Sequence, residues 1–150
     1  MLHVILEIDL ATRHLSLRVD IDTLDCLDRM SKREGMNRSQ LAKALLEEGL
    51  RMADHPGVVF RSGPAGRRPA LATGPDVWEV ARVFRDVDET GEEAIARTAE
   101  LSGLTPQEVR TVVRYYAAYR DEIDAWIRMV DEEAERLEDA WQREQALLGA

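Results

Sequence analysis

Apolar and polar residues alternate strictly over residues 14–20, which read HLSLRVD. Because successive side chains of an extended chain point to opposite faces, this pattern predicts a β-strand with one covered face and one open face. The covered face would carry Leu15, Leu17 and Val19, and the open face would carry His14, Ser16 and Arg18. Residues 1–13 also alternate, and they could form a further strand or a loose extension.

A helix is predicted to follow, from about residue 21 to residue 34. Its apolar residues recur at three- and four-residue steps, Asp20 or Asp22 can cap its first turn, and Gly35 can end it in the left-handed conformation. Cys26, the single cysteine of the chain, lies among the apolar positions of this helix. We therefore expect a buried thiol rather than a nucleophile, and no disulfide within the chain.

A second helix is predicted from Asn37 to about Met52. Asn37 and Gln40 have the spacing of a capping box, and leucines and alanines recur after them at helical steps. Residues 14–53 therefore have the order strand, helix, helix. Such a unit leaves the backbone of its strand unpaired and its apolar face half covered, so we expect it to pair with a second copy of the chain.

Residues 55–76 hold four of the five prolines and four of the nine glycines. We expect a linker loop that separates two sub-domains, in which residues 58–60 could form a short strand. The loop lacks the GxxxxGK[ST] order of a nucleotide-binding loop, so phosphoryl chemistry is not expected. Its paired arginines, Arg67 and Arg68, could bind a phosphate or pair with acidic residues of a neighbouring chain.

The second half of the chain contains three predicted helix starts. These are Asp76 before Val77, Thr90 with Glu93, and Thr105 with Pro106 and Glu108. Residues 77–120 also have the spacing of a helix-turn-helix, with a core formed by Ala99, Gly103, Leu104, Val109 and Val112. Its second helix would expose Gln107, Arg110, Thr111 and Arg114. This unit could contact DNA, or it could serve as a scaffold or protein-binding module.

Residues 121–150 are predicted to form an acidic amphipathic helix. No Gly or Pro separates it from the helix that begins at Pro106, so the two could be continuous. Its apolar stripe could be buried in the chain's own dimer or in a groove of another protein. The candidate partner-binding residues on this stripe are Ile123, Trp126, Ile127, Val130, Leu137 and Trp141.

Negative charge is concentrated in the C-terminal half. Residues 1–55 carry 8 Lys/Arg and 10 Asp/Glu, residues 56–75 carry 3 and 0, and residues 76–150 carry 9 and 19. This asymmetry allows the N-terminal half to approach an anion, whereas the C-terminal half favours cationic partners. The apolar runs are too short for a membrane span and do not form a signal peptide, so we expect a cytoplasmic protein without membrane contact.

The chemistry-bearing residues do not form a recognisable catalytic set. His3, His14 and His55 lie far apart without cysteines at metal-ligand spacing, and the many carboxylates lie on what reads as solvated helix faces. We therefore expect no enzyme, no metal site and no cofactor.

The order strand, helix, helix over residues 14–53 resembles a ribbon-helix-helix domain of the Arc, MetJ and CopG type. The resemblance implies a homodimer whose two strands pair into a ribbon that enters the major groove of DNA. The implied DNA-binding residues are His14, Ser16 and Arg18 on the ribbon and Asn37, Arg38 and Ser39 at the phosphate-binding start of the second helix. Considered alone, the alternation would also suit the edge of an ordinary half-buried sheet.

Two further stretches, HPGVVFRSGPAGRRPALATGPDVWEV and LTPQEVRTVVRYYAAYRDEID, resemble a domain family of unknown function found in antitoxins of the VapB kind. This resemblance covers about residues 55–127 and implies a toxin partner that is a PIN-like ribonuclease. A C-terminal helix of such an antitoxin lies along the toxin, and an arginine on it can compete for the acidic metal site. Arg128, Arg136 and Arg143 are the candidates here.

Together these features favour a mainly α-helical homodimer that acts as an antitoxin and transcriptional autorepressor of a type II toxin-antitoxin operon. Its expected parts are a ribbon-helix-helix domain over residues 1–54, a linker over 55–76, a helix-turn-helix-like domain over 77–120 and an acidic helix over 121–150. Two alternatives remain: a stand-alone ribbon-helix-helix regulator that binds operator DNA without a toxin, and a dimeric adaptor that binds no DNA.

Overall fold

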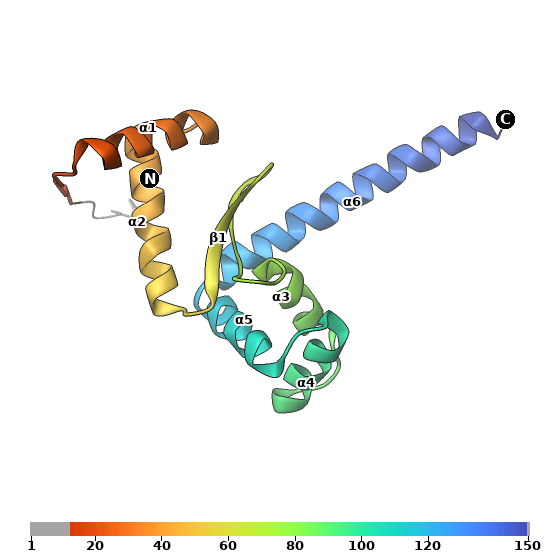
Figure 1. Cartoon of the computed structure of the whole chain (residues 1–150). Coiled ribbons are helices and arrows are strands. Elements are labelled where there is room, and N and C mark those ends of the chain that lie inside the picture. Colours follow the sequence, from red (N-terminus) through yellow and green to blue (C-terminus); the bar gives the residue numbers. More distant parts are fainter. Residues whose placement is uncertain (1–12, 150) are drawn as a thin grey trace, which may run out of the picture.

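The computed structural model describes residues 13–149 and is mainly helical, with six helices and one two-stranded antiparallel sheet among these residues (Figure 1). The helices are α1 (Ile21–Glu34), α2 (Arg38–Asp54), α3 (Val77–Asp86), α4 (Gly91–Ser102), α5 (Pro106–Ala118) and α6 (Arg120–Leu148). The strands are β1 (Val58–Gly63) and β2 (Gly66–Leu71). The predicted mainly α-helical class is therefore confirmed, whereas the alternation of residues 1–12 lies outside the described residues.

The ends of α1 and the start of α2 lie where the sequence predicts them. The Asp20 carboxylate accepts a hydrogen bond from the Thr23 backbone N–H at 2.7 Å, and Gly35 ends α1 with a left-handed φ of 68°. Asn37 and Gln40 form the predicted capping box. Side-chain oxygens thus bind amide donors that have no partner within the helix, which fixes the turn between α1 and α2.

Residues 13–20 are not part of a strand in the single chain, so the strand predicted over residues 14–20 is not observed there. A strand is stabilised by a paired neighbour, and no described segment of the same chain lies beside this one to pair with it. All eight of these residues are exposed. Pairing with a second chain stays a prediction.

The linker loop predicted over residues 55–76 is wrong for most of its length, because these residues form the β1–β2 hairpin. The strands pair antiparallel from Val58 with Leu71 to Gly63 with Gly66. Gly63, Pro64 and Gly66 lie at the turn, where Gly66 has a φ of 109° that favours glycine, and the other five Gly and Pro residues lie before β1, within β2 or after it. The short strand considered over residues 58–60 is therefore part of β1, whereas β2 was not predicted.

The core of the protein lies between α3, α5 and the first turns of α6, with α4 and the hairpin at its edges (Figure 1). We call this assembly the C-terminal unit. Its fully buried side chains are Val77, Val80, Val109, Val112, Tyr115, Ile123 and Ile127. Removal of these side chains from water is the main source of its stability.

Two of the three predicted helix starts in the C-terminal unit form capping boxes. They are Asp76 with Glu79 and Thr105 with Glu108. Thr90 also precedes a helix, but its side chain makes no capping hydrogen bond, so the predicted box with Glu93 is not formed. Gly91 follows Thr90 with a left-handed φ of 60°, whereas a capping box needs helical geometry from that residue onward.

Helices α5 and α6 are separate rather than continuous. Tyr119 interrupts them with φ −128° and ψ 42°, although neither glycine nor proline occurs nearby. The Tyr119 ring packs against the Tyr115 ring at 4.6 Å and beneath the Arg51 guanidinium at 4.1 Å. Tertiary contacts of an aromatic side chain therefore accompany the break. From there α6 projects far beyond the C-terminal unit (Figure 1).

Two apolar residues of α6 allow a matched test of this packing. We expect Ile127→Ala to lower the free energy of unfolding by about 2–5 kcal/mol, since it leaves a cavity in a fully buried site. Leu137→Ala, on the exposed part of the same stripe, should change it by less than about 0.5 kcal/mol. Urea unfolding of both variants measures the difference, and equal losses would contradict the assigned core.

Candidate nucleic-acid and protein interfaces

Residues 13–20, which we call the N-terminal segment, expose a row of large apolar side chains that continues to Ile21 at the start of α1. Leu15, Leu17, Val19 and Ile21 are 62%, 70%, 52% and 76% exposed. On the polar side, Nε2 of His14 lies 3.3 Å from Oγ of Ser16, so these two candidate DNA-binding residues share a face as the alternation predicts. The apolar row therefore lacks a cover within residues 13–149.

Helix α1 has no fully buried residue. Cys26 is exposed, so the expected buried thiol is wrong for the single chain. The reason is that α1 packs mainly on α2, which leaves its remaining surface in solvent. The N-terminal segment and α1 thus form one contiguous region in which apolar residues are poorly covered.

Two of the three predicted phosphate-binding residues at the start of α2 already form hydrogen bonds within the chain. The Asn37 side chain accepts a hydrogen bond from the backbone N–H of Gln40 at 2.9 Å. The Arg38 guanidinium donates to both carboxylate oxygens of Asp28, at 2.6 and 2.7 Å. This hydrogen-bonded pair lowers the pKa of Asp28 and raises the pKa of Arg38. Ser39 is exposed.

Arg67 and Arg68 bind acidic residues of their own chain, so neither a free phosphate site nor pairing with a neighbouring chain describes them. Arg67 donates through Nε and Nη2 to the Glu48 carboxylate of α2, at 2.7 and 2.8 Å. Arg68 pairs with Asp76 at the start of α3. Because the hairpin places the two neighbouring side chains on opposite faces, one arginine holds α2 and the other holds α3.

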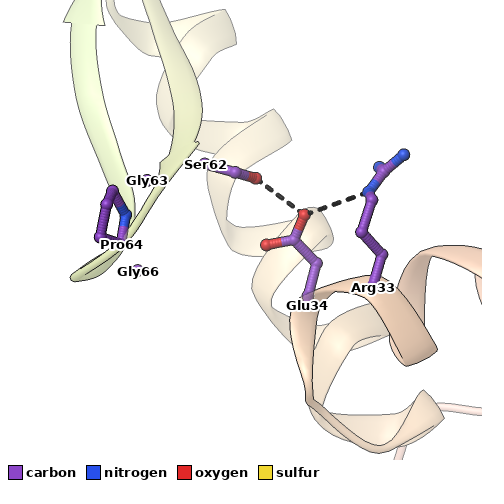
Figure 2. A pocket seen from close by; sticks show the side chains of 6 residues that line it. All are labelled: Arg33, Glu34, Ser62, Gly63, Pro64 and Gly66. Atoms are coloured by element: carbon purple, nitrogen blue, oxygen red, sulfur yellow. Dashed lines mark hydrogen bonds and ion pairs between the residues drawn. The ribbon is translucent and has the colours of Figure 1, made fainter.

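The hairpin also reaches the end of α1. Figure 2 shows Glu34 between two partners: it accepts a hydrogen bond from Oγ of Ser62 at 2.8 Å, and Nε of Arg33 lies 3.7 Å away. An open cleft of about 600 Å³ lies here, lined by Arg33, Glu34, Ser62, Gly63, Pro64 and Gly66. Through the Ser62–Glu34 hydrogen bond the hairpin contacts the end of α1.

A second junction joins α2 to the C-terminal unit. Arg51 donates hydrogen bonds to the Tyr115 hydroxyl at 3.1 Å and to the Glu122 carboxylate at 2.8 Å. Burial opposes the charge of Arg51, but these hydrogen bonds outweigh it and raise its pKa. Burial also raises the pKa of the Tyr115 hydroxyl to about 12. The sequence contained no signal for this junction, because Arg51 lies 64 and 71 residues before Tyr115 and Glu122.

The helix-turn-helix packing of α4 and α5 follows the predicted spacing, with Ala99, Val109 and Val112 buried and Gly103 left-handed at a φ of 65°. On its outer face Arg110 is bound to Glu92 of α4, with Nη2 2.6 Å from a carboxylate oxygen. Arg114 is exposed. The Thr111 hydroxyl donates to the backbone carbonyl of Gln107 at 3.1 Å.

Solvent exposure differs along the candidate partner face of α6. Ile123 and Ile127 are 0% exposed, so their assignment as partner-binding residues is wrong, since they complete the core of their own chain. Trp126 and Val130 are half-buried. Leu137 and Trp141 are 63% and 60% exposed, and Leu148 continues the stripe. Among the predicted partner-binding residues, the exposed apolar side chains are therefore confined to the distal part of α6.

No known protein family, curated protein or solved structure matches the chain. None of the helices within residues 13–149 combines the length and apolar character needed to cross a membrane. In the same range, no group of three or more His, Cys, Asp and Glu side chains is placed to hold a metal ion.

The bidentate contact between Arg67 and Glu48 should contribute substantially to stability. Arg67→Gln leaves the nearly buried Glu48 carboxylate without its cation, and we expect a loss of about 3 kcal/mol in the free energy of unfolding. Arg114→Gln, on exposed α5 surface, is the matched control and should be nearly neutral. Denaturant unfolding at neutral pH measures both variants. Similar values for the two would contradict the role of Arg67.

The Asp28–Arg38 pair predicts a local pH dependence. Because the folded-state pKa of Asp28 is lowered, the pair stabilises the fold above the ordinary Asp pKa of 3.8 and loses this effect as pH falls through the lowered value. Arg38→Gln should raise the Asp28 pKa toward 3.8, as followed by carboxyl-carbon NMR. Arg33→Gln is the control, and an unchanged Asp28 pKa in Arg38→Gln would refute the pairing.

Proposed function

We propose that the chain is a ribbon-helix-helix DNA-binding protein that acts as the antitoxin and autorepressor of a type II toxin-antitoxin operon. The observation that carries this proposal is the exposed apolar row of the N-terminal segment, directly before two capped helices. Exposed leucines at alternate positions favour pairing with a second strand, and a second copy of the same segment supplies one with the same pattern.

The polar face of such a ribbon would present His14, Ser16 and Arg18 twice, related by a two-fold axis. A two-stranded ribbon fits the DNA major groove, where an arginine donates to O6 and N7 of guanine. The amides at the start of α2 would bind a phosphate, and Arg38 would exchange its Asp28 partner for that phosphate. The ribbon therefore supplies sequence readout, while the helix start supplies orientation.

The toxin-binding part of the proposal is supported by the exposed distal half of α6. Leu137 and Trp141 lie on a helix that projects away from the C-terminal unit (Figure 1). An apolar helix face of this kind fits a groove on a second protein, which we propose to be a PIN-like ribonuclease. Repression and toxin binding would then reside at opposite ends of one chain.

One observation favours a stand-alone regulator instead. Ile123 and Ile127, which the sequence assigns to the partner face, are buried in the chain's own core. The first part of α6 thus has a structural role that needs no toxin. Purification of the native protein separates the two functions: a stoichiometric small nuclease supports the antitoxin, and its absence supports the lone regulator.

The central test of DNA binding uses duplexes selected from a random library by the purified protein. We expect Arg18→Ala to weaken binding to a selected duplex by about 1–3 kcal/mol and to relax its sequence preference. Arg120→Ala, at the exposed start of α6, is the control and should bind like the parent chain. If Arg18→Ala binds with unchanged affinity and sequence preference, the proposed readout by the ribbon is wrong.

A further inference from the structure

The distal part of α6 carries an apolar stripe that continues the core-facing side of the helix into solvent. With about 3.6 residues per turn, one face collects the side chains that follow Ile127 at three-, four- and seven-residue steps. These are Val130, Ala134, Leu137, Trp141 and Leu148. The last three are 63%, 60% and 73% exposed. We call this face the distal stripe.

Acidic residues border the distal stripe. On the helical wheel Glu133 and Glu144 lie on one side of it, and Glu138 lies on the other. Residues 131–149 contain seven Asp/Glu and two Lys/Arg. Both arginines, Arg136 and Arg143, fall away from the stripe, and Arg136 is paired with Glu133. The stripe therefore has an apolar centre within a negative field.

This charge pattern disfavours a second α6 as the occupant. In a helix pair, the residues beside the apolar seam face those of the partner, so two copies would bring glutamates together in either orientation. The same negative field opposes nucleic acid and the anionic surface of a membrane. The complementary surface is a protein surface with an apolar floor and positive edges.

We propose that the distal stripe docks into an apolar groove of a partner protein whose edges carry lysine or arginine. The inference rests on the proposed function in one respect, because that function gives α6 a protein partner. It adds the chemistry of the partner: apolar contact with Leu137, Trp141 and Leu148, and basic side chains facing Glu133, Glu138 and Glu144. The glutamates would select the partner, and the apolar residues would supply most of the affinity.

Two synthetic helical peptides of about three heptads test this chemistry with the full-length protein. Both have an apolar seam, and they differ only in carrying lysine or glutamate beside it. We expect the lysine peptide to bind at least about tenfold more tightly than the glutamate peptide, and the preference to shrink at high salt. Isothermal titration calorimetry gives both affinities. Leu137→Asp with Trp141→Asp should abolish binding.

A matched pair of triple variants separates edge charge from net charge. Glu133→Lys, Glu138→Lys and Glu144→Lys should reverse the preference toward the glutamate peptide. Glu132→Lys, Glu135→Lys and Asp139→Lys change the net charge equally on the opposite face and should preserve the preference for lysine. All six positions are exposed, and circular dichroism checks that the helix content is kept.

Three results would overturn the inference: equal binding of both peptides, no binding of either, or self-association of the chain that Leu137→Asp and Trp141→Asp remove. The proposed function fails by a different route. If the selected-DNA experiment gives no specific binding while the lysine peptide still binds as expected, the role in gene control is wrong and the docking surface stands.

Discussion

The burial of apolar side chains between α3, α5 and the first turns of α6 is the interaction on which the rest of the structure depends. It fixes the C-terminal unit and sets the direction in which α6 leaves it (Figure 1). Outside this unit Leu41 of α2 is buried as well, whereas α1 has no buried residue. Two further apolar surfaces, the N-terminal segment and the distal stripe, stay exposed at opposite ends of the described chain, and we propose that partners bind there.

Polar contacts connect these ends. Arg67 holds α2 to the hairpin, Arg68 holds the hairpin to α3, and Arg51 holds α2 to α5 and α6. Each guanidinium donates hydrogen bonds to a carboxylate that is partly shielded from solvent. Because hydrogen bonds are directional, these contacts constrain the orientation of the two elements as well as pairing their charges. The α1–α2 pair is therefore fixed relative to the C-terminal unit, although few apolar side chains join them.

Local sequence signals predicted much of the fold, because short-range chemistry controls helix ends. Asp20, Gly35 and the Asn37 capping box act within a few residues and were correctly located. Only a short strand over residues 58–60 was considered for the hairpin, because its strands are short and its glycines and prolines resemble those of a loop. Likewise, the internal burial of Ile127 and the pairing of Arg67 depend on distant segments, which periodicity does not reveal. The candidate DNA-binding residues remain predictions.

We propose that one chain is incomplete at its N-terminal segment and that a second copy completes it. The test is amide hydrogen exchange of residues 14–20, measured together with the molecular mass in solution. We expect a particle of twice 17.0 kDa with slow exchange at alternate amides of this segment. A monomer whose residues 14–20 exchange at the rate of an unstructured chain would contradict it.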